Sequence, residues 1–169
     1  DIKKADYLIL PGVGAFNQCI KNLKKYNLIE ILNEMVIGNS KPILGICVGM
    51  QLMADFSEEN GMHQGLGWIP GKVVKLKASP ENAIPHVGWN NLLIKKDKNL
   101  FKNKQYSPHF YFDHSYQYLC KKDHIVAYCK YEINITAAIN FNNIYGVQFH
   151  PEKSQNNGLK LFRSFLSYY

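Results

Sequence analysis

Arginine is almost absent from this sequence. Arg163 is the only arginine among the 20 Lys and Arg residues, although the formal net charge is +7. Arginine is the side chain best shaped to read phosphates and base edges, and lysines spread along a chain mainly affect solubility and non-specific contacts. The charge excess therefore does not predict a protein that binds DNA or RNA.

Long apolar runs and paired cysteines are also missing. A helix that spans a bilayer needs about 18 or more consecutive apolar residues, and the chain has neither such a run nor a signal peptide. The cysteines are far apart, with no C-x-x-C pair, which argues against a zinc site and against a disulfide framework; they are Cys19, Cys47, Cys120 and Cys129. We expect a cytoplasmic protein with reduced thiols and without a membrane span, a metal or a cofactor.

The first part of the chain alternates apolar runs with helical spacing, as in a layered α/β fold. The length of 169 residues suits one domain, which we place at residues 1–169. The runs at 6–11 and 42–46 predict buried strands of a mostly parallel sheet. Helical spacing covers 16–36, where Asn27 can divide it into two helices, and 48–56. The strand and helix that usually open such a fold are missing before Asp1, so we expect an N-terminal piece to be absent.

Short strands dominate the rest of the chain, which predicts an antiparallel extension of the sheet. We place them at 72–77, 109–113, 116–119, 125–130, 135–140 and 144–149, with 79–105 as a loop-rich insertion. Asn157 is the expected N-cap of a last helix. The apolar side chains that this helix is expected to bury on one face are Leu159, Phe162, Phe165, Leu166 and Tyr169.

A cysteine between two glycines stands where the second strand meets its helix. Gly45-Ile-Cys-Val-Gly49 fits the pattern G-x-nucleophile-x-G, in which a tight turn exposes a nucleophile in strained backbone geometry. A sulfur near a helix N-terminus is also expected to favour the reactive thiolate. By itself, the pentapeptide fits a buried core cysteine equally well.

A histidine with a carboxylate two residues later follows the last strand. In the extended segment that Pro151 favours, residues two apart project to the same side, so Glu152 can orient the imidazole of His150. Cys47, His150 and Glu152 would then form a nucleophile, base and carboxylate triad. Taken alone, the tripeptide His-Pro-Glu more often marks a surface turn.

A glycine-rich turn, Pro11-Gly-Val-Gly14, follows the first strand. Its backbone N–H groups can serve a tetrahedral oxyanion at the sheet edge, although such a turn by itself is usually only a turn. All three motifs follow predicted strands of one sheet, and open α/β sheets place their sites at the carboxyl ends of their strands. Together they therefore predict an active site.

These segments resemble a known family. KPILGICVGMQLM, LILPGVGAF and GVQFHPEKS are similar to the class I glutamine amidotransferases, and IPHVGWNNL with YFDHSY narrows the resemblance to glutaminase subunits of imidazole glycerol phosphate synthase. The resemblance covers essentially the whole chain. It implies a three-layer α/β/α fold with a mixed central sheet, whose first strand and helix would precede Asp1.

The resemblance also implies roles for individual residues. Cys47 would attack the side-chain amide of glutamine, with His150 and Glu152 completing the triad. The oxyanion would be bound by N–H groups of Val13, Gly14 and Val48. The residues implied to contact the substrate glutamine are Gly14, Gln51, Ser115 and Tyr116.

The resemblance implies a partner as well. Ammonia released from glutamine would pass to a (β/α)₈ cyclase subunit that forms imidazole glycerol phosphate in histidine biosynthesis. The residues implied to face this partner are Pro85, Trp89, Asn90 and Lys153, for which ordinary loop packing is the other reading.

Two positions depart from the family pattern. Asp113 stands where a small apolar residue is usual, and Val87 where methionine is frequent. They leave open a related glutaminase that supplies ammonia for amidation of surface sugars. An inactive truncated remnant and a cysteine hydrolase that acts on another amide or ester are the remaining alternatives.

Overall fold

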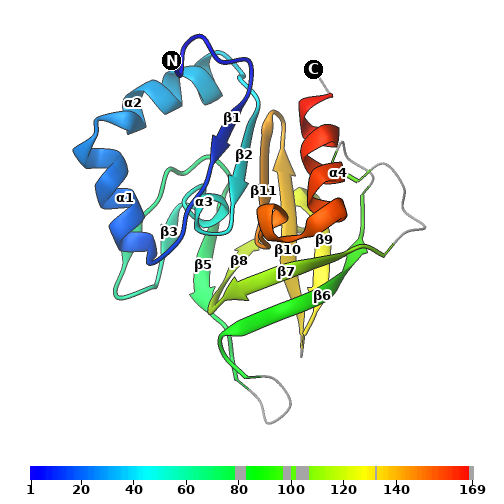
Figure 1. Cartoon of the computed structure of the whole chain (residues 1–169). Coiled ribbons are helices and arrows are strands. Elements are labelled where there is room, and N and C mark those ends of the chain that lie inside the picture. The colour runs from blue at the N-terminus through cyan, green and yellow to red at the C-terminus, as the bar shows by residue number, and fades with distance from the viewer. Residues whose placement is uncertain (79–82, 97–99, 102–106, 132, 168–169) are drawn as a thin grey trace.

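The largest element is a seven-stranded mixed sheet, seen in a computed structural model that describes residues 1–78, 83–96, 100–101, 107–131 and 133–167 (Figure 1). Its parallel part contains β1 (Leu8–Leu10), β2 (Ile43–Ile46) and β11 (Ile144–Val147). The sheet continues antiparallel through β10 (Asn134–Phe141), β9 (Ile125–Lys130), β6 (His86–Ile94) and β7 (His109–His114). The expected parallel strands are confirmed, and the antiparallel extension is confirmed for β7, β9 and β10. The expectation is wrong for the last strand, because β11 is parallel to β2, and for the strands expected at 72–77 and 116–119, which join a second sheet.

A second, four-stranded sheet packs beside the first (Figure 1). It contains β4 (His63–Gln64), β3 (Phe56–Ser57), β5 (Gly71–Lys75) and β8 (Tyr116–Cys120). Only Ser115 separates β7 from β8, so at this residue the chain leaves one sheet for the other.

The helices begin with α1 (Phe16–Lys25) and α2 (Leu28–Asn33), which continues as a π-helical turn at Glu34–Gly38. Asn27 adopts the left-handed conformation, with φ of 52°, and divides α1 from α2 as expected. The chain then forms α3 (Val48–Gln51), 3₁₀ turns at Lys122–His124 and Pro151–Lys153, and α4 (Gln155–Leu166). In the described ranges, no helix is long and apolar enough to cross a membrane.

Helices cover both faces of the main sheet. The ring of Phe165 in α4 contacts Tyr145 with centroids 5.7 Å apart, whereas Met50 of α3 lies against the neighbouring residue, Gly146. Because successive residues of a strand face opposite sides, α3 and α4 lie on opposite faces of β11. This arrangement confirms the three-layer α/β/α fold.

Two expectations about helices are wrong. The helix expected at 48–56 ends at Gln51, because the next carbonyls, of Leu52 and Met53, accept N–H groups of Leu66 and Trp68 from the following loop. Asn157 is not the N-cap, since α4 already begins at Gln155, and its side chain donates to the carbonyl of His109.

The expected buried face of α4 is also only partly correct. Leu159 and Leu166 are 53% and 49% exposed, and the buried positions are Gly158, Leu161 and Phe165. Residue 169 lies outside the described part of the chain.

The loop-rich insertion expected at 79–105 is wrong where the structure describes it, because it contains the nine-residue strand β6. β6 pairs with β7 on one side and with β9 on the other. Its side chains alternate only weakly in polarity, so this long-range pairing, rather than local pattern, makes it a strand. Residues 79–82, 97–99 and 102–105 of the expected insertion lie outside the described residues.

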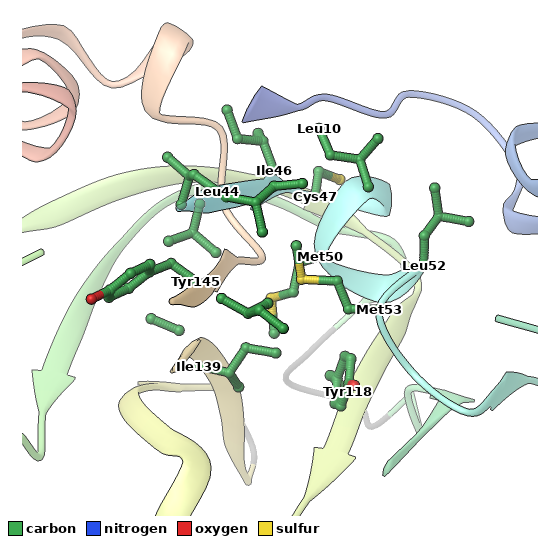
Figure 2. Packing of buried hydrophobic residues seen from close by; sticks show 14 of the residues in the cluster. Leu10, Leu44, Ile46, Cys47, Met50, Leu52, Met53, Tyr118, Ile139 and Tyr145 are labelled. Carbon is green, nitrogen blue, oxygen red and sulfur yellow. The ribbon is translucent and has the colours of Figure 1, made fainter. Parts of the chain in front are cut away.

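Leu10 of the first strand lies close to Cys47 at the start of α3 (Figure 2), and glycines allow this approach. A Cβ atom on Gly49 would lie 1.8 Å from the carbonyl oxygen of Leu10, and one on Gly45 would lie 2.7 Å from the carbonyl oxygen of Gly49. These contacts are closer than real Cβ atoms make, so β1, β2 and α3 pack together only with glycine at both positions.

Replacement of Gly49 by alanine is therefore expected to destabilise the fold. The added methyl group meets backbone rather than a flexible side chain, so Gly49→Ala should lower the free energy of unfolding by about 3 kcal/mol, at the upper end of overpacking costs. Urea unfolding followed by tryptophan fluorescence measures the change.

Gly38→Ala is the matched control, because an added Cβ at Gly38 meets nothing within 4 Å. It should leave the free energy of unfolding unchanged or raise it by up to about 1 kcal/mol. Equal effects of the two substitutions would contradict the packing argument.

Candidate active site

A cavity of about 320 Å³ opens at the carboxyl ends of β1, β2 and β11. Pro11–Gly14, Cys47 and His150 each follow one of these strands, so the parallel order brings the three motifs to one edge of the sheet. The residues that line the cavity are Val13, Gly14, Cys47, Val48, Gln51, Glu59, Pro85, Asp113, His114, Ser115, Tyr116, His150 and Lys153.

Cys47 occupies the tight turn between β2 and α3. Its φ of 51° and ψ of −113° are costly for a residue with a Cβ atom, and its N–H donates to the carbonyl of Val147 at 2.8 Å. The close contact between Gly45 and Gly49 shows why this turn needs small residues on both sides. Figure 2 shows Cys47 at the start of α3, between Leu10 and Ile46.

The thiol of Cys47 is buried, with only 4% of the residue exposed. The pKa of Cys47 is raised to about 12, mainly by burial and in smaller part by the carboxylates of Asp113 and Glu152, although the N–H groups of Val48 and Gln148 act to lower it. The expectation that the helix N-terminus favours a thiolate is wrong here, because α3 has only four residues and desolvation of the charged form is larger. The attacking sulfur must therefore lose its proton to a base.

His150 lines the same cavity as Cys47 and is the candidate for that base. Its Nδ1 lies 2.6 Å from Oε1 of Glu152, which can only accept, so Nδ1 carries the proton and Nε2 keeps its lone pair. The backbone N–H of His150 donates to the carbonyl of Tyr111, and the Ser154 hydroxyl donates to the backbone carbonyl of His150. Both backbone bonds hold the ring at the cavity.

The glycine-rich turn lies against the start of α3. A Cβ on Gly12 would meet the backbone nitrogen of Gly49 at 2.8 Å, and Gly14 has a φ of +91° that side chains rarely adopt. The Val13 carbonyl accepts from the thiol of Cys19 at 3.6 Å. In a trans peptide the N–H points away from the carbonyl, so the Gly14 N–H points away from Cys19.

Gln51, Ser115 and Tyr116 line the cavity beside the thiol. Gln51 is 3% exposed, and its Nε2 donates to the carbonyl of Tyr116 at 3.2 Å and to Oε1 of Gln148 at 3.0 Å. The sequence reasoning missed Gln148, although a glutamine within the apolar run at 144–149 is a polar group that must be satisfied when buried.

Glu59 is a second residue that the sequence reasoning missed. It lines the cavity, and its Oε2 accepts from the N–H of Phe16 at the start of α1, at 2.8 Å. Nothing in the spacing of the sequence places Glu59 at the cavity, because its position depends on the path of the loop after α3. Its carboxylate gives the cavity a group that can bind an ammonium.

His86 and His114 form a buried pair, of which His114 lines the cavity. His114 Nδ1 lies 2.8 Å from the carbonyl of Tyr116 and so must donate, which leaves its Nε2 to accept from Nδ1 of His86 at 3.0 Å. Burial lowers the pKa of His86 to about 4 and that of His114 to about 3. Within the described ranges, no group of three or more His, Cys, Asp or Glu side chains could hold a metal ion.

The residues implied to face a partner fall into two groups. Pro85 and Lys153 line the cavity, and the Lys153 ammonium lies 5.5 Å from the ring centroid of Tyr111, whose ring in turn contacts Trp89. Trp89 is 45% exposed, whereas the side chain of Asn90 donates to the carbonyl of Lys130. Adjacent strand residues face opposite sides, so Trp89 and Asn90 do not share one surface.

Asp113 and Val87, the two positions that depart from the family pattern, lie near the residues implied to face a partner. Val87 is 53% exposed on the same side of β6 as Trp89. Asp113 lines the cavity, and its carboxylate raises the pKa of Cys47.

The neutral histidine pair predicts a loss of stability in acid. Below the ordinary histidine pKa of 6.5 the unfolded chain takes up protons that the folded pair resists until about pH 4 for His86 and about pH 3 for His114. The free energy of unfolding should therefore fall as the pH is lowered from 6.5 towards 4. His114→Gln removes one of these groups and should make that fall shallower.

Ile139→Val is the control, because it removes one buried methyl group, costs about 1 kcal/mol and carries no titrating group. It should lower stability at every pH and leave the slope unchanged. Urea unfolding at a series of pH values measures the slopes, and the same slope for His114→Gln as for the unaltered chain would contradict the assignment.

Comparison with known proteins finds one family over nearly the whole chain. The family profile described as "Glutamine amidotransferase class-I" matches residues 2–167. The imidazole glycerol phosphate synthase subunit HisH 2 of Vibrio vulnificus is 49% identical, over 99% of this chain and 78% of that protein. The subunit HisH of Leptospira interrogans is 42% identical, over 99% of this chain and 83% of that protein.

Solved structures show the same fold. The structure of PurLQS from Thermotoga maritima superposes with a TM-score of 0.71 at 20% identity, over 96% of this chain and 79% of that chain. A glutamine amidotransferase structure gives a TM-score of 0.71 at 18% identity, over 95% of this chain and 77% of that chain.

Proposed function

Because this chain belongs to the class I glutamine amidotransferase family, as the motifs of its sequence predicted, we propose that it is the glutaminase subunit of an imidazole glycerol phosphate synthase. It hydrolyses glutamine to glutamate and ammonia in histidine biosynthesis. The observation that carries the proposal is the convergence of Cys47, His150 with Glu152 and the glycine-rich turn on one cavity.

The first half of the reaction forms a thioester. Nε2 of His150 takes the proton of the Cys47 thiol as the sulfur attacks the side-chain amide carbon of glutamine. Glu152 holds the imidazole and stabilises the positive charge that it gains. The oxyanion accepts hydrogen bonds from the N–H of Val48 and from the Val13 and Gly14 turn.

The second half releases both products. The protonated His150 gives its proton to the leaving nitrogen, the C–N bond breaks, and ammonia departs. His150 then takes a proton from the water that attacks the thioester carbonyl. The C–S bond breaks, and His150 returns this proton to the sulfur, which restores the thiol of Cys47, while the new carboxyl group of glutamate loses its proton to solvent. The proton count therefore balances over one turnover.

Groups around the cavity select an amino acid as substrate. The Glu59 carboxylate suits the α-ammonium of glutamine, since opposite charges attract strongly in a partly dry site. Gly14, Ser115 and Tyr116 offer backbone groups, and Gln51 offers its side-chain carbonyl, because its amide hydrogens already bond Gln148 and Tyr116.

The partner is a (β/α)₈ cyclase that receives the ammonia. Pro85 and Lys153 stand at the cavity, and Trp89 is exposed beside Tyr111, so this surface gives a partner direct access to the place where ammonia forms. Asn90 bonds within the chain and supports the same strand. The relatives are named as subunits of an imidazole glycerol phosphate synthase, which supports the presence of a partner subunit.

Cys47→Ala is expected to abolish glutamine hydrolysis, because no other cysteine lines the cavity within the described residues. Glutamate release is measured with and without the cyclase subunit and its ligand. The unaltered chain should be stimulated strongly by the cyclase, and Cys129→Ala, which removes another buried thiol, should keep its activity.

Three results would contradict the proposal in different ways. Full activity of Cys47→Ala would exclude the mechanism. Stimulation only by a sugar-amidating partner would favour the related glutaminase. Hydrolysis of other amides or esters without any partner, together with no hydrolysis of glutamine, would favour a cysteine hydrolase.

Glu152→Gln is expected to lower kcat by about 10²–10⁴-fold, because a neutral amide neither fixes the Nδ1–H tautomer nor stabilises the imidazolium. Glu58→Gln serves as the control, since Glu58 pairs with Lys72 on the surface at 3.8 Å. Steady-state kinetics with glutamine measures both variants. Equal kcat values for the two would contradict the role of Glu152.

A further inference from the structure

Gln148 is buried between the reactive thiol and a residue that lines the cavity. It has no exposed surface, follows β11 directly, and its backbone N–H donates to the carbonyl of Ala137 at 2.9 Å. Its carboxamide contacts Gln51 through Oε1 at 3.0 Å and Cys47 through Nε2, 3.8 Å from Sγ. A buried carboxamide is retained only where its polar atoms are paired.

A backbone carbonyl fixes the direction of these bonds. The Tyr116 carbonyl can only accept, so the Gln51 atom that faces it must be the amide nitrogen. That nitrogen also faces Gln148, so the Gln148 atom in this contact must be Oε1. The amide group of Gln148 then points at Sγ of Cys47, and the sulfur is the acceptor. The orientation does not depend on an arbitrary choice of amide flip.

The donor is suited to the sulfur at the moment of attack. A hydrogen bond to a charged acceptor is about twice as strong as one to a neutral acceptor, so the contact tightens as the thiol loses its proton. The rotation of Gln148 about its own side chain is restricted by Gln51. The carboxamide of Gln148 therefore contacts both Gln51 and Sγ of Cys47, so the position of Gln51 influences the direction of Sγ.

We propose that Gln148 is a positioning residue of the glutaminase reaction, which aims the sulfur of Cys47 and holds Gln51 in place for the substrate. The inference rests on the proposed function for its catalytic consequence. Gln148 touches neither the substrate nor His150 in this scheme, and it acts through its two neighbours.

Two substitutions of Gln148 separate the effects of its bond to Gln51 and its bond to Cys47. Gln148→Glu, as a carboxylate, keeps an oxygen for Gln51, loses the donor to Sγ and adds a negative charge beside the sulfur. Gln148→Met has a similar volume, adds no charge and loses both bonds. Asn140→Leu is the matched control, because Asn140 is a buried carboxamide on β10 that bonds Asn142 and Ile144, away from the cavity. This substitution should lower the free energy of unfolding without changing the hydrogen bonds of the Cys47 thiol.

The first readout is the rate at which iodoacetamide alkylates Cys47 between about pH 7 and 9, with the site mapped by mass spectrometry. Only the thiolate reacts, so loss of the donor should slow alkylation by about tenfold in both Gln148 variants, whereas Asn140→Leu should react at least as fast as the unaltered chain. A purely structural role predicts the reverse, because loosening of the fold exposes the buried thiol and speeds alkylation.

The second readout is the steady-state kinetics with the cyclase partner. Gln148→Glu should lower kcat by about tenfold with KM for glutamine within about twofold, and Gln148→Met should also raise KM because Gln51 is released. Alkylation of Cys47 at or above the normal rate in the Gln148 variants would overturn the inference. The alkylation experiment needs no turnover, so it tests the inference even where the proposed function fails. If Gln148→Met does not fold, alkylation of Gln148→Glu still tests the inference.

Discussion

The backbone turn at Cys47 is the constraint on which the rest of the site depends. Its φ of 51° and ψ of −113° are tolerated because Gly45 and Gly49 let β1, β2 and α3 meet without side chains between them. The turn places the thiol at the edge of the sheet, where the glycine-rich turn and His150 also arrive. Packing energy of the core thus maintains the strained backbone of Cys47.

Burial gives the site its electrostatic character. Water is largely excluded from the thiol and from the histidine pair, so the pKa of Cys47 lies near 12 and those of His86 and His114 lie near 4 and 3. The uncharged forms of these groups prevail at neutral pH. In the proposed mechanism, proton transfer therefore falls to His150, whose partner Glu152 is half exposed.

The sequence predicted the parts of the site that are local and missed those that are not. Apolar runs ended by glycine or proline located the turns that hold Gly14, Cys47 and His150, because these signals lie within a few residues of one another. Strand β6, the short α3, Glu59 and Gln148 depend on neighbours distant in the chain. The pKa of Cys47 was misjudged for the same reason, since desolvation is a property of the assembled core.

The most direct test of the account is covalent labelling by a glutamine analogue that carries an electrophilic carbon in place of the side-chain amide. Intact-mass and peptide mass spectrometry would be carried out on the chain with its cyclase partner. The account predicts one adduct, on Cys47, whose formation is slowed by glutamine. Label spread over Cys19, Cys120 or Cys129, or labelling of Cys47 that glutamine does not slow, would contradict it.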